Sequence, residues 1–380
     1  MRRGRLPSRD LLLHRPGSFT LAVVAVCGLI GCAGDALRQP QRSPESIQAD
    51  IQALIPARVA QRAAWAVDLQ LVFAALKLDP STENVCAVLA VTEQESTFDP
   101  DPQVPNLAKV AREEILRRAD GLGVPDVAVN LALKLQSPDG RSYDDRLKAV
   151  KTERELSLMY EQFIDEVPLG RRLFANWNPV RTGGPMQVSI AFAEEHVRAH
   201  PYPFPAQDSV RHEVFTRRGG LYFGTAHLLG YATSAYGPTM IYRFADFNAG
   251  RYASRNAAFQ QALAVASGRP LDLDGDLFVG ASAPPGQTEL AARSLGGDIG
   301  MDDRSIRRKL ERSNSEDFDR SPLLAKVFSM AQARSGQPQP RAVLPRIVLK
   351  SPKFTRRLTT EWFARRVDER FKRCQARDAG

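Results

Sequence analysis

The hydrophobic pattern of this chain is mostly that of α-helices, because apolar side chains recur every three or four residues through much of its length. Trp65 and Phe73 fall on such apolar faces and are predicted core residues. Only residues 344–349 have the pattern of a strand or an extended arm. The sequence therefore predicts a mainly α fold. The predicted helices cover residues 47–54, 58–76, 107–119, 126–135, 143–174, 188–200, 221–231, 296–312 and 359–371, besides the one described next.

One further helix stands out because its apolar run ends in a carboxylate. Asp79 is placed to cap this helix, and Pro80 suits its first position. Glu95 falls at the border of the apolar stripe, where its carboxyl group would be partly withdrawn from water. Such burial favours the neutral acid, which can donate a proton. An ordinary polar helix end has the same pattern. The stripe comprises Val85, Val88, Leu89 and Thr92.

The N-terminus has the features of an export signal. A basic segment precedes an apolar stretch, Phe19 to Ile30, that is too short for an ordinary membrane span. Leu29-Ile30-Gly31-Cys32 resembles the bacterial lipobox, which predicts cleavage before Cys32 and acylation of this residue. A plain signal peptide with a chance cysteine is the alternative. Ala33 follows Cys32 where aspartate would favour the inner membrane, so we expect attachment to the periplasmic face of the outer membrane.

Charge and cysteine content extend this picture. The chain of 380 residues carries a formal charge of +9, of which five arginines and one aspartate lie in residues 1–31, so the mature chain carries +5. That excess suits an anionic polymer such as peptidoglycan, and no nucleic-acid motif is present. Cys27 leaves with the signal and Cys32 takes lipid, which leaves Cys86 and Cys374 in an oxidising compartment. A disulfide between them is a hypothesis, because two remaining thiols in an exported protein often pair.

Three short segments resemble the lytic transglycosylases, a lysozyme-like family that cleaves peptidoglycan. Residues 94–98, Gln-Glu-Ser-Thr-Phe, resemble the Glu-Ser-x-Phe signature of that family. Residues 184–188 resemble its Gly-Leu-Met-Gln segment, and residues 245–250 resemble its Ala-x-Tyr-Asn-Ala-Gly segment. A fainter match covers residues 224–231. The matches span residues 80–265, and the whole chain resembles an uncharacterised family of proteobacterial lipoproteins that carries this pattern.

The resemblance implies cleavage between N-acetylmuramic acid and N-acetylglucosamine with Glu95 as the single acid and base. It implies no cofactor and no metal. Ser96 would orient the glutamate or the acetamido group of the substrate. His227 stands where the family usually has tyrosine, and we interpret it as structural because no second ligand lies at metal spacing. Further residues implied to line the substrate groove are Gly184, Met186, Gln187, Tyr242, Phe247 and Asn248.

The chain also departs from the family. Phe98 and Gly184 are separated by 85 residues, where the family has a short interval. This implies a helical insertion at about residues 103–178. Three alternatives stay open for it: a wall of the groove, a site for a cell-wall protein partner, or an inert insertion. Pro185 replaces a leucine and Phe247 replaces a tyrosine. Two alternatives therefore stay open: a hydrolytic lysozyme, and a non-catalytic lipoprotein that binds peptidoglycan or serves as a scaffold.

The expected organisation follows from these segments. A signal peptide (1–31) precedes the acylated cysteine and a polar, proline-bearing tether (32–46). A lysozyme-like helical domain with the large insertion covers residues 47–330. A C-terminal extension with an amphipathic helix covers residues 331–380. The acidic segment 272–276 resembles a fragment of a calcium loop but lacks its bidentate glutamate, so a tight turn is expected there.

Overall fold

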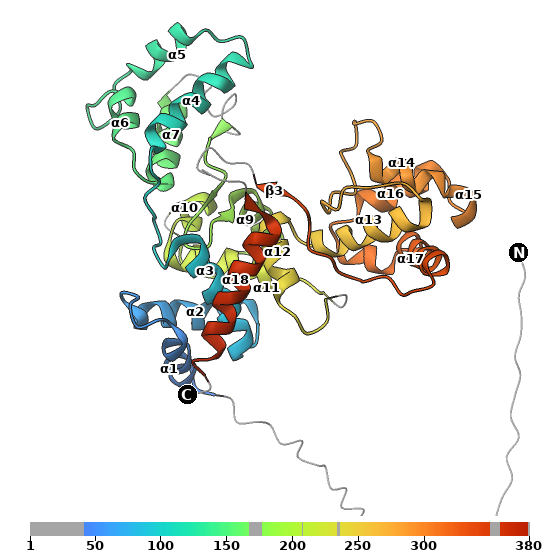
Figure 1. Cartoon of the computed structure of the whole chain (residues 1–380). Helices are drawn as coiled ribbons and strands as arrows, with labels where there is room; N and C mark the ends of the chain where they lie inside the picture. Colours follow the sequence, from blue (N-terminus) through green and yellow to red (C-terminus); the bar gives the residue numbers. More distant parts are fainter. Residues whose placement is uncertain (1–41, 167–176, 207, 234–235, 350–357, 379–380) are drawn as a thin grey trace, which may run out of the picture. The chain divides into compact units, whose positions relative to one another are not determined.

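The computed structural model describes residues 42–166, 177–206, 208–233, 236–349 and 358–378, and these are mainly helical (Figure 1), which confirms the predicted fold class. The signal segment and Cys32 lie outside these ranges. Residues 43–380 form one compact unit. No helix within the described ranges is both long and apolar enough to cross a membrane.

The helices of the first half are α1 (Pro44–Leu54), α2 (Arg62–Leu76), α3 (Thr82–Ser96), α4 (Leu107–Asp120), α5 (Asp126–Leu133), α6 (Tyr143–Ala149), α7 (Glu153–Glu166), α9 (Ile190–Ala199), α10 (Val210–Val214) and α11 (Arg217–Leu229). Those of the second half are α12 (Ile241–Ala249), α13 (Ala253–Ser267), α14 (Gln287–Ser294), α15 (Gly296–Ile299), α16 (Asp303–Glu311), the 3₁₀ turn η3 (Glu316–Arg320), α17 (Pro322–Ser335) and α18 (Thr360–Gln375). Two antiparallel pairs complete the fold, β1 (Thr182–Gly183) with β2 (Val188–Ser189) and β3 (Val348–Leu349) with β4 (Leu358–Thr359).

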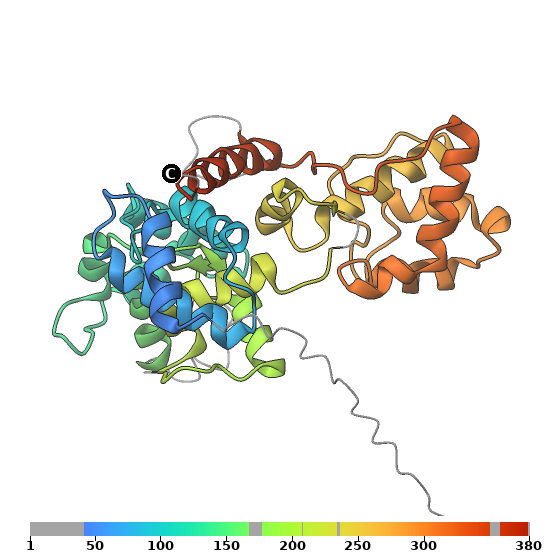
Figure 2. The same cartoon turned by 90° about the horizontal axis from the view of Figure 1, so that it is seen from below.

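The buried apolar side chains form two clusters. The first cluster draws on α1–α7, on α9–α12 and on α18. The second cluster is built by α13–α17. The chain therefore leaves the first cluster after α12, builds the second, and returns to the first with its last helix. The C-terminal helix, expected in an extension, packs along α3 and α12 (Figure 2).

The middle of helix α3 is enclosed in the first cluster. Every residue from Val85 to Thr92 is buried, so the helix is covered on all sides and not along one stripe alone. It begins at Thr82, and the Ser81 side chain accepts a hydrogen bond from the Asn84 N–H at 3.4 Å. The prediction that Asp79 caps this helix was wrong. Ser81 lies two residues later and offers the hydroxyl that N-caps favour.

Two other predicted helices differ from the structure. The stretch 143–174 is not one helix, because α6 ends at Ala149 and α7 begins at Glu153; its last residues lie outside the described ranges. Thr152 and Glu155 explain the break: the Glu155 N–H donates to the Thr152 hydroxyl at 3.2 Å, and the Glu155 carboxylate accepts from the Thr152 N–H at 3.2 Å. This reciprocal pair is a capping box. Val188 begins a strand, and the helix expected from that residue begins at Ile190.

Candidate functional site

Glu95 lies in the last turn of α3, at the point where the buried helix emerges from the core. Thr92 is fully buried, whereas Glu93, Gln94 and Glu95 are partly exposed. Glu95 follows Val88, Val91 and Thr92 at helical spacing, so its carboxyl group adjoins an apolar face. The neighbouring Ser96 is buried, and its hydroxyl donates to the Thr92 carbonyl at 3.1 Å. In this structure the serine is thus bonded to its own helix.

The chain leaves α3 in an unusual backbone conformation. Thr97 and Phe98 both adopt positive φ, at 54° and 64°, although neither is glycine. This left-handed region costs an L-residue about 1–2 kcal/mol. The Phe98 ring is buried and packs edge-on against Trp65, with ring centroids 5.5 Å apart. Two such residues directly after a candidate acid fit the tendency of strained backbone to occur at functional sites.

The second motif segment forms the tight connection between β1 and β2, and it is held against α11. Gly184 has φ of 70°, and a Cβ atom there would lie 2.0 Å from the Val214 carbonyl oxygen. On the facing helix, Cβ atoms at Gly220 and Gly224 would clash with Pro185 and Met186. The glycines on both sides therefore permit a backbone approach that no other residue allows.

The polar and apolar side chains of this segment are occupied within the protein. Met186 is fully buried and belongs to the first cluster. The Gln187 side-chain oxygen accepts a hydrogen bond from the Thr182 hydroxyl at 3.2 Å, and its amide nitrogen donates to the Gly184 carbonyl at 3.4 Å. Gln187 also has a positive φ of 48°. Met186 thus anchors the β1–β2 connection in the first cluster, whereas the side chain of Gln187 is partly exposed.

The third motif segment lies on α12 and is fixed by a residue that the sequence did not single out. Asp246 is fully buried and accepts hydrogen bonds from the Tyr231 hydroxyl at 3.1 Å and from the backbone N–H groups of Tyr252 at 3.0 Å and Ser254 at 2.7 Å. The Tyr236 hydroxyl is a fourth donor. Burial raises the pKa of Asp246, against the opposing effect of these hydrogen bonds. The carboxyl group links the end of α12 to the start of α13.

The residues expected to line a groove on this segment lie on either side of Asp246. Tyr242, Phe247 and Asn248 are all partly exposed. Tyr242 packs against Tyr236, with ring centroids 5.6 Å apart. The Asn248 side-chain oxygen accepts from the Thr360 hydroxyl at 3.0 Å, which joins α12 to the first residue of α18.

Helix α11 brings these three segments into one neighbourhood. It contacts α3, β2 and α12, which carry or adjoin the glutamate, methionine–glutamine and asparagine segments. Phe98, Met186 and Phe247 all belong to the first cluster or pack against it. Segments that lie far apart in the sequence therefore surround a common helix, as the three-part resemblance requires.

The two glutamates of α3 have different surroundings. Glu93 forms an ion pair with Arg58. Two residues apart on a helix, Glu93 and Glu95 point to different sides. Between them, the side-chain oxygen of Gln94 is buried with no hydrogen-bond partner among the described residues. Because buried polar atoms are nearly always paired, this oxygen is an acceptor that a bound polar group would satisfy.

His227 packs between aromatic rings. Its ring centroid lies 4.6 Å from that of Phe192 and 5.2 Å from that of Phe247. Burial, followed by the nearby charge of Arg251, lowers the pKa of His227 to about 4. The imidazole is neutral at pH 7 and serves as packing beside the α12 segment. Within the described ranges, no group of three or more potential ligand side chains could hold a metal ion.

The clearest cavities among the described residues lie away from Glu95. They measure about 290 to 680 Å³ and are lined by residues of α4–α7 and their neighbours, or by the α13–α17 cluster. The segment 272–276 borders one of them as a tight turn, in which the Asp276 N–H donates to the Asp274 carboxylate at 2.9 Å. On the far side of α3, Cys86 and Cys374 form the disulfide that the sequence suggested.

Comparison with known proteins shows that the residues of the candidate site all lie within the region matched by one family model. A family model described as "Protein of unknown function (DUF1615)" matches residues 58–377. The Escherichia coli (strain K12) protein described as "Uncharacterized protein YaiW" is 51% identical over 357 residues, which cover 93% of this chain and 97% of the relative. No solved structure matches. The matched region contains every segment described above, from Glu95 to α18.

Proposed function

The chain belongs to the DUF1615 family, and on that premise we propose that it is a peptidoglycan lytic transglycosylase with Glu95 as its only acid and base. The observation that carries the proposal is the position of Glu95. It stands where the buried part of α3 ends, and α11 contacts the elements that carry or adjoin the two other motif segments. The lysozyme-like character of the core is part of this proposal.

The chemistry requires one carboxyl group. Glu95, protonated at rest, donates its proton to the glycosidic oxygen between N-acetylmuramic acid and N-acetylglucosamine. The 2-acetamido group of the muramoyl sugar stabilises the developing positive charge at C1, a form of substrate assistance. The Glu95 carboxylate then takes the proton of the C6 hydroxyl, and the C6 oxygen bonds to C1. The product is a 1,6-anhydro sugar, and Glu95 regains its proton.

The neighbouring groups have supporting roles in this proposal. The apolar face below Glu95 favours the protonated acid. Gln187 and Asn248, both partly exposed, line the neighbouring subsites. Glu93 has no role as a second carboxylate, because it pairs with Arg58 on another side of α3.

The decisive experiment digests purified sacculi and identifies the products by mass. The wild type is expected to release anhydro-muropeptides, each lighter by one water than the hydrolysis product. Glu95→Gln is expected to lower release at least about 100-fold, since positioned acids contribute about 10² to 10⁴. Glu93→Gln is the matched control: it makes the same chemical change two residues away and is expected to stay within a few-fold of wild type. Products that retain the water would instead identify a hydrolase.

A second candidate is a non-catalytic lipoprotein that binds peptidoglycan. One observation favours it: the five cavities described above are lined by residues other than Glu95. Under this alternative, wild type sediments with sacculi and releases nothing. Glu95→Gln then binds as well as wild type, and the catalytic proposal is refuted.

We also propose that the mature protein is anchored by lipid on Cys32 to the periplasmic face of the outer membrane. The proposal rests on the lipobox-like residues 29–32. In cells fed a labelled fatty acid, wild type is expected to carry the label and to fractionate with outer membranes. Cys32→Ser is expected to lose both. Label that persists in the variant, or a wild type found only in the soluble fraction, would contradict the proposal.

A further inference from the structure

The exposed apolar side chains of this protein gather in one short stretch. Among the described residues, eight large hydrophobic side chains are substantially exposed, and five of them fall within residues 122–135. Val127 is the most exposed of the eight, at 79%, and Leu131 is 69% exposed, the same fraction as Val279. The other three exposed hydrophobic residues, Val67, Val279 and Leu290, are scattered along the chain. The five form what we call the α5 apolar surface: Leu122, Val124, Val127, Leu131 and Leu135.

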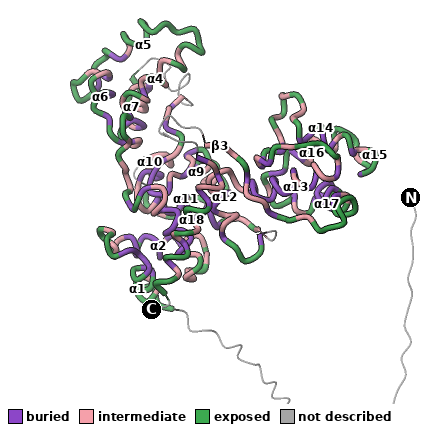
Figure 3. Tube along the Cα trace, in the orientation of Figure 1, coloured by how far each residue is buried: buried purple, intermediate pink, exposed green. Residues whose placement is uncertain are grey.

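Helix α5 is apolar on two sides. Val129 and Leu133 are buried against the first cluster, as expected for the inner side of a surface helix. Val127 and Leu131 are four residues apart and lie together on the outer side of the helix, and Leu135 follows just beyond its end. A surface helix normally carries polar residues there. Figure 3 shows the exposed colour along most of α5 and the loop before it.

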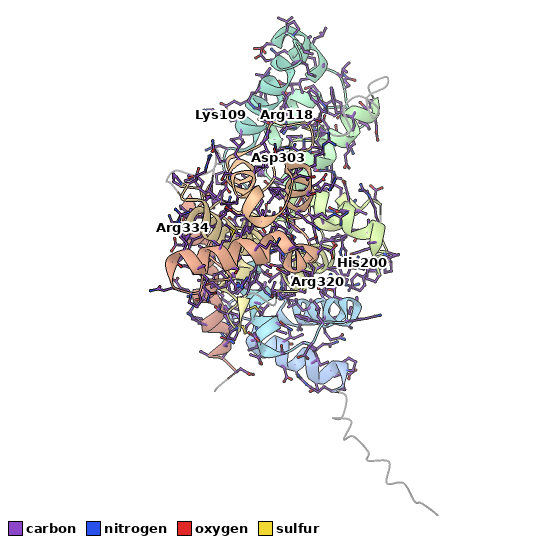
Figure 4. The ribbon with its side chains drawn as sticks, turned by 90° about the vertical axis from the view of Figure 1, so that its right-hand side faces the viewer. Lys109, Arg118, His200, Asp303, Arg320 and Arg334 are labelled. Atoms are coloured by element: carbon purple, nitrogen blue, oxygen red, sulfur yellow. A yellow bond between two sulfur atoms is a disulfide. The ribbon has the colours of Figure 1, made fainter. Side chains whose placement is uncertain are left out.

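A cationic cavity adjoins this surface. A cavity of about 380 Å³ is lined by Arg117, Arg118, Arg181, Gly121, Leu122 and Trp177. Leu122 thus belongs both to the apolar surface and to the cavity. The lining holds three arginines and no acidic residue. Arg118 lies on α4, which carries the side chains labelled at Lys109 and Arg118 in Figure 4.

Two of these arginines have one acidic partner between them. Arg117 and Arg118 share a single carboxylate, that of Glu114, at 2.7 and 2.5 Å. Asp120, at the end of α4, and Asp126, at the start of α5, are exposed but are not among the residues that line the cavity. Arginine guanidinium groups bind phosphate in a bidentate manner, and a tryptophan beside them suits the boundary between apolar and aqueous phases.

We propose that the α5 apolar surface and the arginine cavity together dock on an anionic phospholipid membrane. The apolar side chains would enter the boundary between headgroups and acyl chains while the arginines bind lipid phosphates. Helix α5 has eight residues, which suits a helix that lies in the interface and does not span it. The three arginines beside the apolar side chains suit lipid phosphates, which guanidinium groups bind in a bidentate manner.

The expected tether supports the same occupant. Eleven residues separate Cys32 from Pro44, the first residue of α1. Fully extended, such a segment spans at most about 40 Å. A protein acylated at Cys32 therefore stays beside a bilayer, and even weak docking through the α5 apolar surface is strengthened by the high local concentration of lipid.

Vesicle sedimentation tests the proposal without peptidoglycan, so its outcome is independent of the enzymatic proposal. A chain beginning at Ala33 keeps the whole described fold and omits the apolar leader and the lipid site. It is expected to sediment with vesicles of phosphatidylglycerol and phosphatidylcholine, and much less with phosphatidylcholine alone. Val127→Ser with Leu131→Ser is expected to lower the bound fraction about tenfold, and Arg117→Gln with Arg181→Gln to remove the preference for phosphatidylglycerol.

Matched controls keep this test specific. Val279→Ser with Leu290→Ser removes two exposed hydrophobic side chains from the other cluster and is expected to leave binding within about twofold of wild type. Circular dichroism checks that all variants keep their helical content. A wild type that remains in the supernatant, or control and test variants that lose binding equally, would overturn the proposal. So would self-association of the wild type that the Val127 and Leu131 substitutions abolish, since a second copy would then occupy the surface.

Discussion

At the scale of single residues, the candidate site is defined by side chains whose surroundings only the structure supplies. The sequence singled out Glu95 and the aromatic residues of α12 but not Asp246, although this carboxyl group fixes the segment that carries Phe247 and Asn248. The signal was present: an acid between aromatic residues, followed by a glycine, at the junction of two helices. The groups that donate hydrogen bonds to Asp246 lie both before and after it in the sequence, and no local spacing rule connects them.

His227 leads to a prediction about pH. Its pKa in the folded protein is about 4, below the ordinary value of 6.5, so the unfolded chain binds its proton first as pH falls. The neutral His227 therefore contributes fully to the free energy of unfolding above pH 6.5, and this contribution is lost as the pH falls towards 4. Lowering the pH from 7 to 5 is expected to reduce the free energy of unfolding by up to about 2 kcal/mol through His227.

Urea unfolding of wild type and His227→Phe at both pH values measures this effect. The variant keeps an aromatic ring between Phe192 and Phe247 but cannot take up a proton. Its free energy of unfolding is expected to fall less than that of wild type over the same interval. Equal decreases in the two proteins would show that His227 does not titrate in this range.

At the scale of elements, an amphipathic helix such as α18 was predictable from its apolar face, and the structure places Thr359 as its N-cap. Helix α13 was missed because it is buried all round: Arg255, Asn256 and Gln260 are enclosed with its apolar residues. Their hydrogen bonds to residues 274–319 stabilise them there, so the sequence shows no polar face. The close fit of residues 183–186 on α11 was likewise not readable, since it depends on glycines in both segments.

The disulfide between α3 and α18 leads to a prediction about stability. Cys86 and Cys374 are 288 residues apart, so the bond closes a very long loop and constrains the unfolded chain strongly. Reduction is expected to lower the free energy of unfolding by about 2–5 kcal/mol. Guanidinium unfolding with and without reductant measures it. The double variant Cys86→Ala, Cys374→Ala is expected to unfold like reduced wild type and to be insensitive to reductant; a wild type that ignores reductant would contradict the prediction.

At the scale of the whole molecule, the order of elements along the chain does not follow the order of the clusters. Helices α13–α17 form their own core between two parts of the first. Helix α18 then buries its apolar face against α3 and α12. The first cluster is therefore assembled from segments at both ends of the described chain. The buried residues of α18 include Phe363, Ala364, Val367 and Phe371.

Truncation tests this division. A chain that ends at Pro345 lacks α18 and the disulfide, and the apolar burial it loses is on the order of 1.5–3 kcal/mol for each large side chain. That sum is comparable with the whole stability of a typical domain. Limited proteolysis of the truncated chain is expected to degrade residues 43–250 and to leave a protected fragment near residues 253–343. Full-length protein should protect both regions; a truncated chain that protects residues 43–250 would disprove the dependence.

The return of α18 to α3 also has a consequence for biosynthesis. The ribosome makes the glutamate-bearing helix early and its covering helix almost last, so a nascent chain exposes one side of α3 until translation is nearly complete. If secretion delivers the chain unfolded, the covalent link between the two helices forms only after the final residues have crossed the inner membrane. Under the proposed export, maturation would be coupled to completion of transport, and a prematurely terminated polypeptide would lack the helix that completes the core.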